Sequence, residues 1–171
     1  MNLLQTIRTI EKTAALQPAV SSIVRNDVFR LNASPVAKYG VFAWLQNEHV
    51  SEADSGIVTY NFTFFYVDRL TADKHNELDI QSQGIETLEN ILRRLPDFGL
   101  YPSTYSFRTF NQRFADECAG VFCTVSLDAQ KDGLCAEAYA FLENDGAFNL
   151  DFNEDAHVWE WKTEDRLIYI I

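Results

Sequence analysis

The stretch YNFTFFYVDRL, residues 60–70, decides the fold of this 171-residue chain. Five of its first seven residues are aromatic, and Asp68 and Arg69 follow after Val67. Successive side chains of a strand point to opposite faces, so a period of two marks a half-buried strand. Thr59, Asn61 and Thr63 alternate here with large apolar residues that share the other face: Val58, Tyr60, Phe62, Phe64 and Tyr66. The pattern predicts a strand with a packed aromatic face, not an open aromatic surface.

Two helices are predicted, one on each side of this strand. Apolar residues at helical spacing predict the first over residues 2–16, with Pro18 after its end. The second helix is predicted to begin at a cap formed by Asp73 or Asn76 and to end before Pro96. Its predicted apolar stripe is Leu78, Ile85, Leu88, Leu92 and Leu95, flanked by Ile80 and Ile91. Gly84 inside this helix indicates a close contact or a break.

Further strands are predicted over residues 22–32, 37–46, 104–113 and 119–127, with a polar hairpin loop at 47–56. The order of helix, strands, helix and strands is typical of an α+β fold. We therefore expect a mostly antiparallel sheet packed by an N-terminal and a central helix. The core domain is predicted to span residues 1–136, and residues 137–171 form an acidic, aromatic C-terminal extension.

Composition limits the function. With 47% hydrophobic residues and 13 phenylalanines, the chain can bury a real core. Its net charge of -11 argues against a protein that grips nucleic-acid phosphate, but suits an acidic wall past which DNA slides. No membrane-spanning segment is predicted, because charges interrupt the N-terminal apolar run. Cys118, Cys123 and Cys135 form no metal-binding spacing and are interpreted as free thiols.

The C-terminal extension has a distinct character. Residues 143–165 hold eight acidic residues and a single lysine, interleaved with large apolar residues. The chain then reads RLIYII, a β-prone run that would invite aggregation if it stayed unpaired. We expect this run to be covered, either within the fold or by a neighbour. Trp159 and Trp161 would share one face of a strand, as core residues or as anchors in a partner's groove.

No catalytic, metal or cofactor site is predicted. The chain lacks a phosphate-binding loop, a nucleophile elbow and a zinc-binding HExxH motif. His49 near Glu52 and Asp54 is interpreted as part of a solvated loop. His75 beside Asp73 is interpreted as a surface residue, and His157 near Asp155 and Glu160 as part of the acidic extension. Cys118 has no histidine near it in sequence, so we do not assign it as a nucleophile.

Asp68 and Arg69, directly after the aromatic strand, leave three interpretations open. They form a local ion pair, a cap for the next segment, or half of a bridge between subunits. As a hypothesis, both belong to an intersubunit interface together with two C-terminal apolar arms. The residues of those arms are Val158, Trp159, Trp161, Leu167, Ile168, Tyr169, Ile170 and Ile171.

Three segments together resemble a known family. FFYVDRLTADKHNELDIQSQGIETLENILRRL joins an aromatic strand to a helix, TFNQRFADECAGVFCTVSL adds a strand, and GLCAEA supplies a last cysteine. They resemble tail-completion and neck proteins of tailed phages and prophages of Bacteroidetes. The element order is also similar to the tail-terminator fold of head-tail connectors. The resemblance covers roughly residues 36–136, and the acidic extension has no counterpart in it.

The resemblance implies a structural virion protein that forms a ring between the capsid portal and the tail. It would be made in the cytoplasm of the host bacterium and reside at the head-tail junction or in the tail. The implied partners are other copies of the chain and neighbouring portal, connector and tail-tube proteins. DNA would pass through the ring without sequence-specific binding, and no enzymatic activity, cofactor or membrane contact is implied.

Two rival functions stay open on the sequence. An N-terminal helix packed on a curved sheet can form a cone-shaped pocket for a small ligand or an enzymatic reaction, similar to nuclear transport factor two. Aromatic residues would then line a cavity: Tyr39, Tyr60, Phe62, Phe64 and Tyr66. The acid-base group would be Asp68 or Asp116 with a distant histidine. Alternatively, the chain is an acidic cytosolic adaptor or immunity-type protein that neutralises a basic partner.

Overall fold

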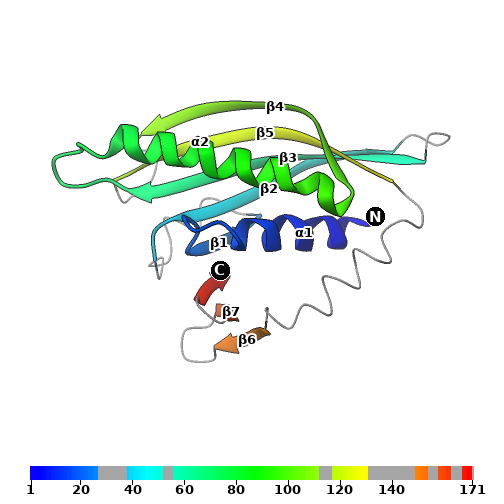
Figure 1. Cartoon of the computed structure of the whole chain (residues 1–171), viewed down its shortest axis with the longest axis horizontal. Helices are drawn as coiled ribbons and strands as arrows, with labels where there is room; N and C mark the ends of the chain where they lie inside the picture. The colour runs from blue at the N-terminus through cyan, green and yellow to red at the C-terminus, as the bar shows by residue number, and fades with distance from the viewer. Residues whose placement is uncertain are drawn as a thin grey trace.

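The computed structural model describes residues 1–26, 38–51, 56–111 and 117–130, together with the backbone of 149–153, 158–162 and 167–170. It is an α+β fold in which two helices cover one face of a mostly antiparallel sheet (Figure 1). Five strands from the first 130 residues lie in the order β4-β5-β3-β2-β1, and three C-terminal strands continue it as β8-β7-β6. The predicted fold class is therefore confirmed.

The aromatic strand β3 (Ile57–Arg69) is the centre of the sheet. It pairs antiparallel with β5 (Cys118–Gln130) over its whole length and with β2 (Val41–Ser51) on its other side. Its alternate residues from Val58 to Tyr66 are buried under the helices, as predicted. Phe64 packs against Phe42 and Phe62, with ring centroids 5.4 and 5.9 Å apart. The aromatic face is a filled core and not a cavity wall.

Helix α1 (Leu3–Ala15) begins with a reciprocal cap. The Asn2 carboxamide accepts a hydrogen bond from the Gln5 N–H at 2.9 Å, and the Gln5 carboxamide accepts one from the Asn2 N–H at 2.8 Å. This arrangement satisfies two backbone donors that the helix itself leaves unpaired. Ile10 and Ala14, two of the apolar residues whose spacing predicts this helix, are buried, whereas a third, Leu4, is 56% exposed and lies outside the core.

Helix α2 (Glu77–Arg94) continues into a short 3-10 helix, η2 (Leu95–Phe98). The predicted stripe is wrong at its start, because Leu78 is 76% exposed. Ile80 and Ile91, expected as flanking residues, are buried instead. Of the two alternatives predicted for Gly84, a close contact or a break in the helix, the structure shows the close contact. A Cβ atom there would lie 2.9 Å from Val121 Cγ2 and 3.0 Å from Tyr66 Cδ1, so the missing side chain lets α2 approach the sheet.

Three strand boundaries differ from those predicted. Strand β1 (Ser22–Arg25) is short, and most of the remainder of the predicted segment 22–32 lies outside the described residues. Strand β2 begins after Gly40, whose φ of 86° favours glycine, and runs on to Ser51 with a bulge between Gln46 and Glu48. Its extension is the first part of the predicted polar loop 47–56, where the pairing with β3 overrides a hydrophilic composition.

The strands after α2 are longer than predicted. Strand β4 (Leu100–Asn111) starts four residues earlier than expected and forms a hairpin with β5. Tyr105, Phe107 and Thr109 pair with Val125, Cys123 and Val121, so the predicted common face is the helix-covered face. A second apolar cluster lies on the opposite face and includes Val41, Ala43, Val67 and Phe110.

The three C-terminal strands lie beyond β1. Strand β8 (Leu167–Ile170) pairs parallel with β1, β7 (Val158–Lys162) pairs antiparallel with β8, and β6 (Asn149–Asn153) pairs antiparallel with β7. The apolar run at the end of the chain is thus paired within its own sheet. Ile171, a predicted interface residue, and residues 163–166 lie outside the described residues.

The buried carboxylate of Glu11 connects α1 to β1 and β2, and β1 is the strand that pairs with the C-terminal strand β8. Glu11 is 0% exposed, and its two oxygens accept hydrogen bonds from Arg25 Nε and Nη2, both at 2.7 Å. One oxygen also accepts the indole N–H of Trp44 at 3.0 Å. The cluster joins α1, β1 and β2 through one side chain, so the position of β1 depends on Glu11.

We predict that Glu11→Ala destabilises the fold by about 3 kcal/mol, because it leaves Arg25 and the Trp44 N–H without their acceptor inside the protein. Urea unfolding followed by Trp fluorescence measures this loss. Glu86→Ala, at an exposed position of α2, is the matched control and should change stability by less than about 0.5 kcal/mol. Equal effects of the two substitutions would contradict the anchoring role of Glu11.

Candidate assembly interface

Strand β4 presents the most accessible backbone edge of the core domain. It is the terminal strand of the sheet, and among the described strands it pairs only with β5. It is 12 residues long, and most of its side chains are exposed, including Tyr101 at 53% and Tyr105 at 54%. Monomeric proteins usually shorten or cover such an edge, because its free N–H and C=O groups can pair with another chain. This edge therefore offers backbone groups to which a strand of another chain can add.

An apolar hollow of about 380 Å³ lies beside this edge, between the end of α2 and β4. The Tyr105 ring is held against Phe107 in an edge-to-face contact, with centroids 5.7 Å apart. The lining combines apolar rings with one cation and one anion: Glu89, Leu92, Arg93, Pro96, Pro102 and Tyr105. A strand added to β4 would place alternate side chains over this hollow.

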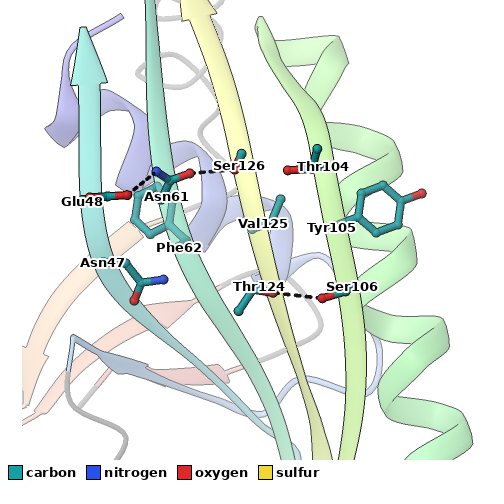
Figure 2. A pocket seen from close by; sticks show the side chains of 10 residues that line it. All are labelled: Asn47, Glu48, Asn61, Phe62, Thr104, Tyr105, Ser106, Thr124, Val125 and Ser126. Carbon is teal, nitrogen blue, oxygen red and sulfur yellow. Dashed lines mark hydrogen bonds between the residues drawn. The ribbon is translucent and has the colours of Figure 1, made fainter.

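The face of the sheet opposite the helices carries a row of polar side chains (Figure 2). Asn61 links two strands, because its Nδ2 donates to Glu48 Oε1 at 3.3 Å and its Oδ1 accepts from Ser126 at 2.7 Å. Ser106 and Thr124 share a hydrogen bond of 3.0 Å. They surround a shallow hollow of about 490 Å³, lined by Asn47, Glu48, Asn61, Phe62, Thr104, Tyr105, Ser106, Thr124, Val125 and Ser126. The hydrogen bonds partly satisfy these groups, so the face is a polar, solvated surface.

Asp68 and Arg69 are held locally, on opposite faces of β3. The Asp68 carboxylate accepts a hydrogen bond from the Arg69 N–H at 2.7 Å, while the Arg69 guanidinium lies 5.8 Å from the centroid of the Tyr39 ring. Burial raises the pKa of the Asp68 carboxyl, and the hydrogen bond from the Arg69 N–H partly offsets that rise. Their role between subunits stays a prediction.

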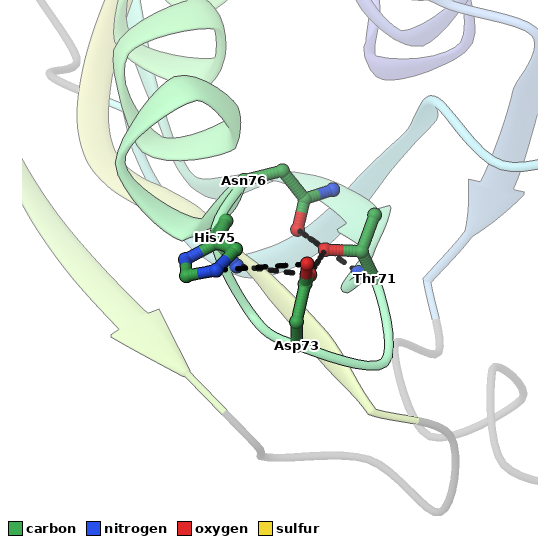
Figure 3. A network of polar contacts seen from close by, with 4 residues as sticks. All are labelled: Thr71, Asp73, His75 and Asn76. Carbon is green, nitrogen blue, oxygen red and sulfur yellow. Dashed lines mark hydrogen bonds and ion pairs between the residues drawn. The ribbon is translucent and has the colours of Figure 1, made fainter.

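The turn between β3 and α2 is closed by a polar network (Figure 3). Asn76 Oδ1 accepts from the Thr71 N–H at 2.9 Å, and Asn76 Nδ2 donates to the Arg69 carbonyl at 3.1 Å. Asn76 is the residue before α2, but its side chain ties the turn and does not cap the helix. Asp73 accepts from the Thr71 hydroxyl at 2.6 Å, which lowers the pKa of Asp73. The network fixes the exit from the aromatic strand.

The histidines and cysteines do not come together in the described part of the chain. The His75 side chain is 86% exposed and lies 3.6 Å from Asp73, as expected for a surface residue. His49 lies in β2 opposite Tyr60 and not in a loop, which corrects its predicted placement. His157, Asp116 and Cys135 lie outside the described residues, as do Glu52 and Asp54. Within the described ranges, no group of three His, Cys, Asp or Glu side chains could hold a metal ion.

The aromatic residues of the rival pocket model do not share a wall. Tyr60, Phe62, Phe64 and Tyr66 are at most 5% exposed and fill the core under the helices. Tyr39 packs with the cluster on the opposite face. Burial and the neighbouring Asp68 charge raise the pKa of Tyr66, whose hydroxyl donates to Gln83 at 3.2 Å. These five side chains therefore do not enclose one cavity.

The predicted interface residues of the extension lie on the far side of the sheet from β4. Val158, Trp159 and Trp161 belong to β7, and Leu167, Ile168, Tyr169 and Ile170 belong to β8. Sequence reasoning missed the β4 edge, because the order of strands in a sheet does not follow from their periodicity. Pro102 was a usable signal, since proline within a strand is confined to edges and bulges.

A scan of known family models found none that matches this chain, and a search of curated proteins found no relative. None of the helices in the described ranges is long and apolar enough to cross a lipid bilayer.

We predict that Cys123 resists alkylation in the folded protein. Its side chain is 0% exposed, and burial raises the pKa of its thiol to about 12, so almost no reactive thiolate exists at pH 8. Mass spectrometry of peptides after iodoacetamide treatment should show Cys123 unmodified. The same treatment in guanidinium chloride is the control and should modify it fully. Modification of Cys123 in the native protein would show that the sheet opens here.

Proposed function

We propose that this chain is a structural virion subunit of a tailed phage, which forms a ring at the head-tail junction and joins the capsid portal to the tail. The observation that carries the proposal is the exposed edge of β4, a 12-residue strand with two exposed tyrosines. An exposed edge of this length presents backbone N–H and C=O groups with which a strand of another chain can pair. Repeated pairing between identical copies through different surfaces generates a ring when the rotation closes.

Three further observations support this proposal over a small-ligand role. The fold class agrees with the element order of tail-terminator proteins that the sequence resembles. The aromatic face of β3 is filled by core packing, which leaves no aromatic cavity around it. The net charge of -11 suits a channel whose wall must not bind the DNA that passes through it. The proposed partners are thus other copies of the chain, with portal and tail-tube proteins above and below.

Electron microscopy of the full-length protein tests the ring directly. Negative staining across a concentration series should show closed particles with a central hole, and analytical ultracentrifugation should give one discrete mass above that of the 19.6 kDa chain. A protein that stays monomeric up to its solubility limit would overturn the proposal. Sequencing the DNA beside the gene tests the placement in a virion. Portal, capsid or tail genes support it, whereas metabolic or toxin genes contradict it.

We predict that deletion of residues 143–171 abolishes assembly and leaves a folded domain. The deletion removes β6, β7 and β8, while both helices and strands β1–β5 keep their shared core. Circular dichroism should show native-like secondary structure, and ultracentrifugation should show a monomer. Normal assembly of the truncated protein would show that the extension plays no part in subunit contacts.

A further inference from the structure

The sheet ends in two edges that the structure leaves open. Among the described strands, β4 pairs only with β5 at one end, and β6 pairs only with β7 at the other. The two edges belong to the same eight-stranded sheet but to opposite ends of it (Figure 1). A contact between β4 of one copy and β6 of the next would therefore be heterologous, and it would continue the sheet from subunit to subunit.

The strand directions make this contact antiparallel. Strand β4 is antiparallel to β5 and β5 to β3, so β4 runs in the same direction as β3. Strands β2, β1 and β8 all run opposite to β3, β7 runs with it, and β6 again runs opposite. Two copies placed side by side in the same orientation thus bring together a β4 and a β6 of opposite direction. Antiparallel pairing is the slightly more stable of the two arrangements.

The charges of the two edges are complementary. Residues 92–111, which include the end of α2 and all of β4, contain Arg93, Arg94 and Arg108 but only one acidic residue, Asp97. Arg93 lines the hollow on the helix side, and Arg108 is exposed on the other face of β4. A cation is therefore available whichever face an incoming acidic residue takes. Although Glu89 also lines the hollow, the three arginines make this edge less acidic than the chain as a whole, which has a net charge of -11.

The β6 edge carries acidic residues in its sequence and register. Asp151 is the middle residue of β6, and the register pairs it with Glu160 of β7. An arginine supplied by another chain would complement this charge. Leu150 and Phe152 flank Asp151 in the strand, so β6 also supplies apolar residues to the contact.

We propose that the β6 edge of one copy binds antiparallel to the β4 edge of the next, so that one continuous sheet runs around the assembly. This inference rests on the proposed function, because it specifies the contact by which the ring closes. The occupant of the β4 edge is a second copy of this chain. The five residues of β6 cover only part of the 12 residues of β4, which leaves a length of edge for an adjoining protein.

Charge reversal with mixing tests the pairing. The basic-edge variant carries Arg93→Glu and Arg108→Glu, and the acidic-edge variant carries Asp151→Lys. Each variant alone places like charges at every contact and should sediment as a monomer at concentrations where the native chain assembles. An equal mixture restores opposite charges at both kinds of contact and should assemble again. The control for the basic-edge variant is Arg8→Glu with Lys38→Glu. It makes the same net charge change as that variant, at exposed sites away from both edges, and should assemble normally.

Each outcome decides the inference. Unchanged assembly of both variants, or a mixture that stays monomeric, would overturn the pairing of β4 with β6. If the native chain still forms rings in that case, the proposed function stands. A native chain that never assembles would remove both. If a variant fails to fold by circular dichroism, a second test uses Ser106→Cys with Asp151→Cys. Oxidation or a short bis-maleimide should then give a ladder of linked copies only in the double variant, and absence of the ladder would overturn the pairing.

Discussion

The burial of the aromatic face of β3 is the interaction on which the remaining structure depends. This strand is paired on both sides, and its face meets both helices. Each large aromatic ring removes on the order of 150–250 Å² from water, so a row of four dominates the apolar burial of the domain. The close approach of α2 at Gly84 follows from the same packing, because Tyr66 and Val121 occupy the space that a side chain would take.

The two helices cover only one face of the sheet, and this bears on where subunits can make contact. Both helices lie on the aromatic face, so the opposite face is left with a row of hydrogen-bonded polar side chains and a small apolar cluster near one end. That row is largely satisfied internally and needs no partner. The open backbone groups lie at the ends of the sheet instead. The described backbone edges to which a strand can add are therefore those of β4 and β6, which is why we place the subunit contact there and not on the flat face.

The sequence predicts those structural features that depend on neighbouring residues. The alternation from Val58 to Tyr66 and the helical spacing of apolar residues in α1 depend on near neighbours, and the fold class built on them is confirmed. Leu78 was assigned to the core because helical spacing alone does not say where a helix first meets the sheet. Residues 47–51 were assigned to a loop because their polarity hides a pairing with β3. The edge of β4 depends on strand order, which is a property of the whole sheet.

In the candidate site, too, the local contacts were predictable and the contacts between distant segments were not. Asp68 and Arg69 were singled out by their position after an apolar run, and they have local contacts to the backbone and to Tyr39. Arg93 and Arg108 were not assigned to an interface, because they are far apart in sequence and only the strand order shows that both lie beside the β4 edge. Glu11, Arg25 and Trp44 likewise form one buried cluster from three separate segments. Long-range pairs of this kind become visible only when the topology is known.

Hydrogen exchange measured at two protein concentrations tests the central claim, that the ends of the sheet hold the subunits together. Backbone amides gain protection when they enter a hydrogen bond, and the gain reports position along the chain. Our account predicts that protection in residues 100–111 and 149–153 increases between the monomeric and the assembled concentration, while residues 59–67 stay protected at both. Concentration-independent exchange of β4, or new protection confined to the polar face of the sheet, would contradict it.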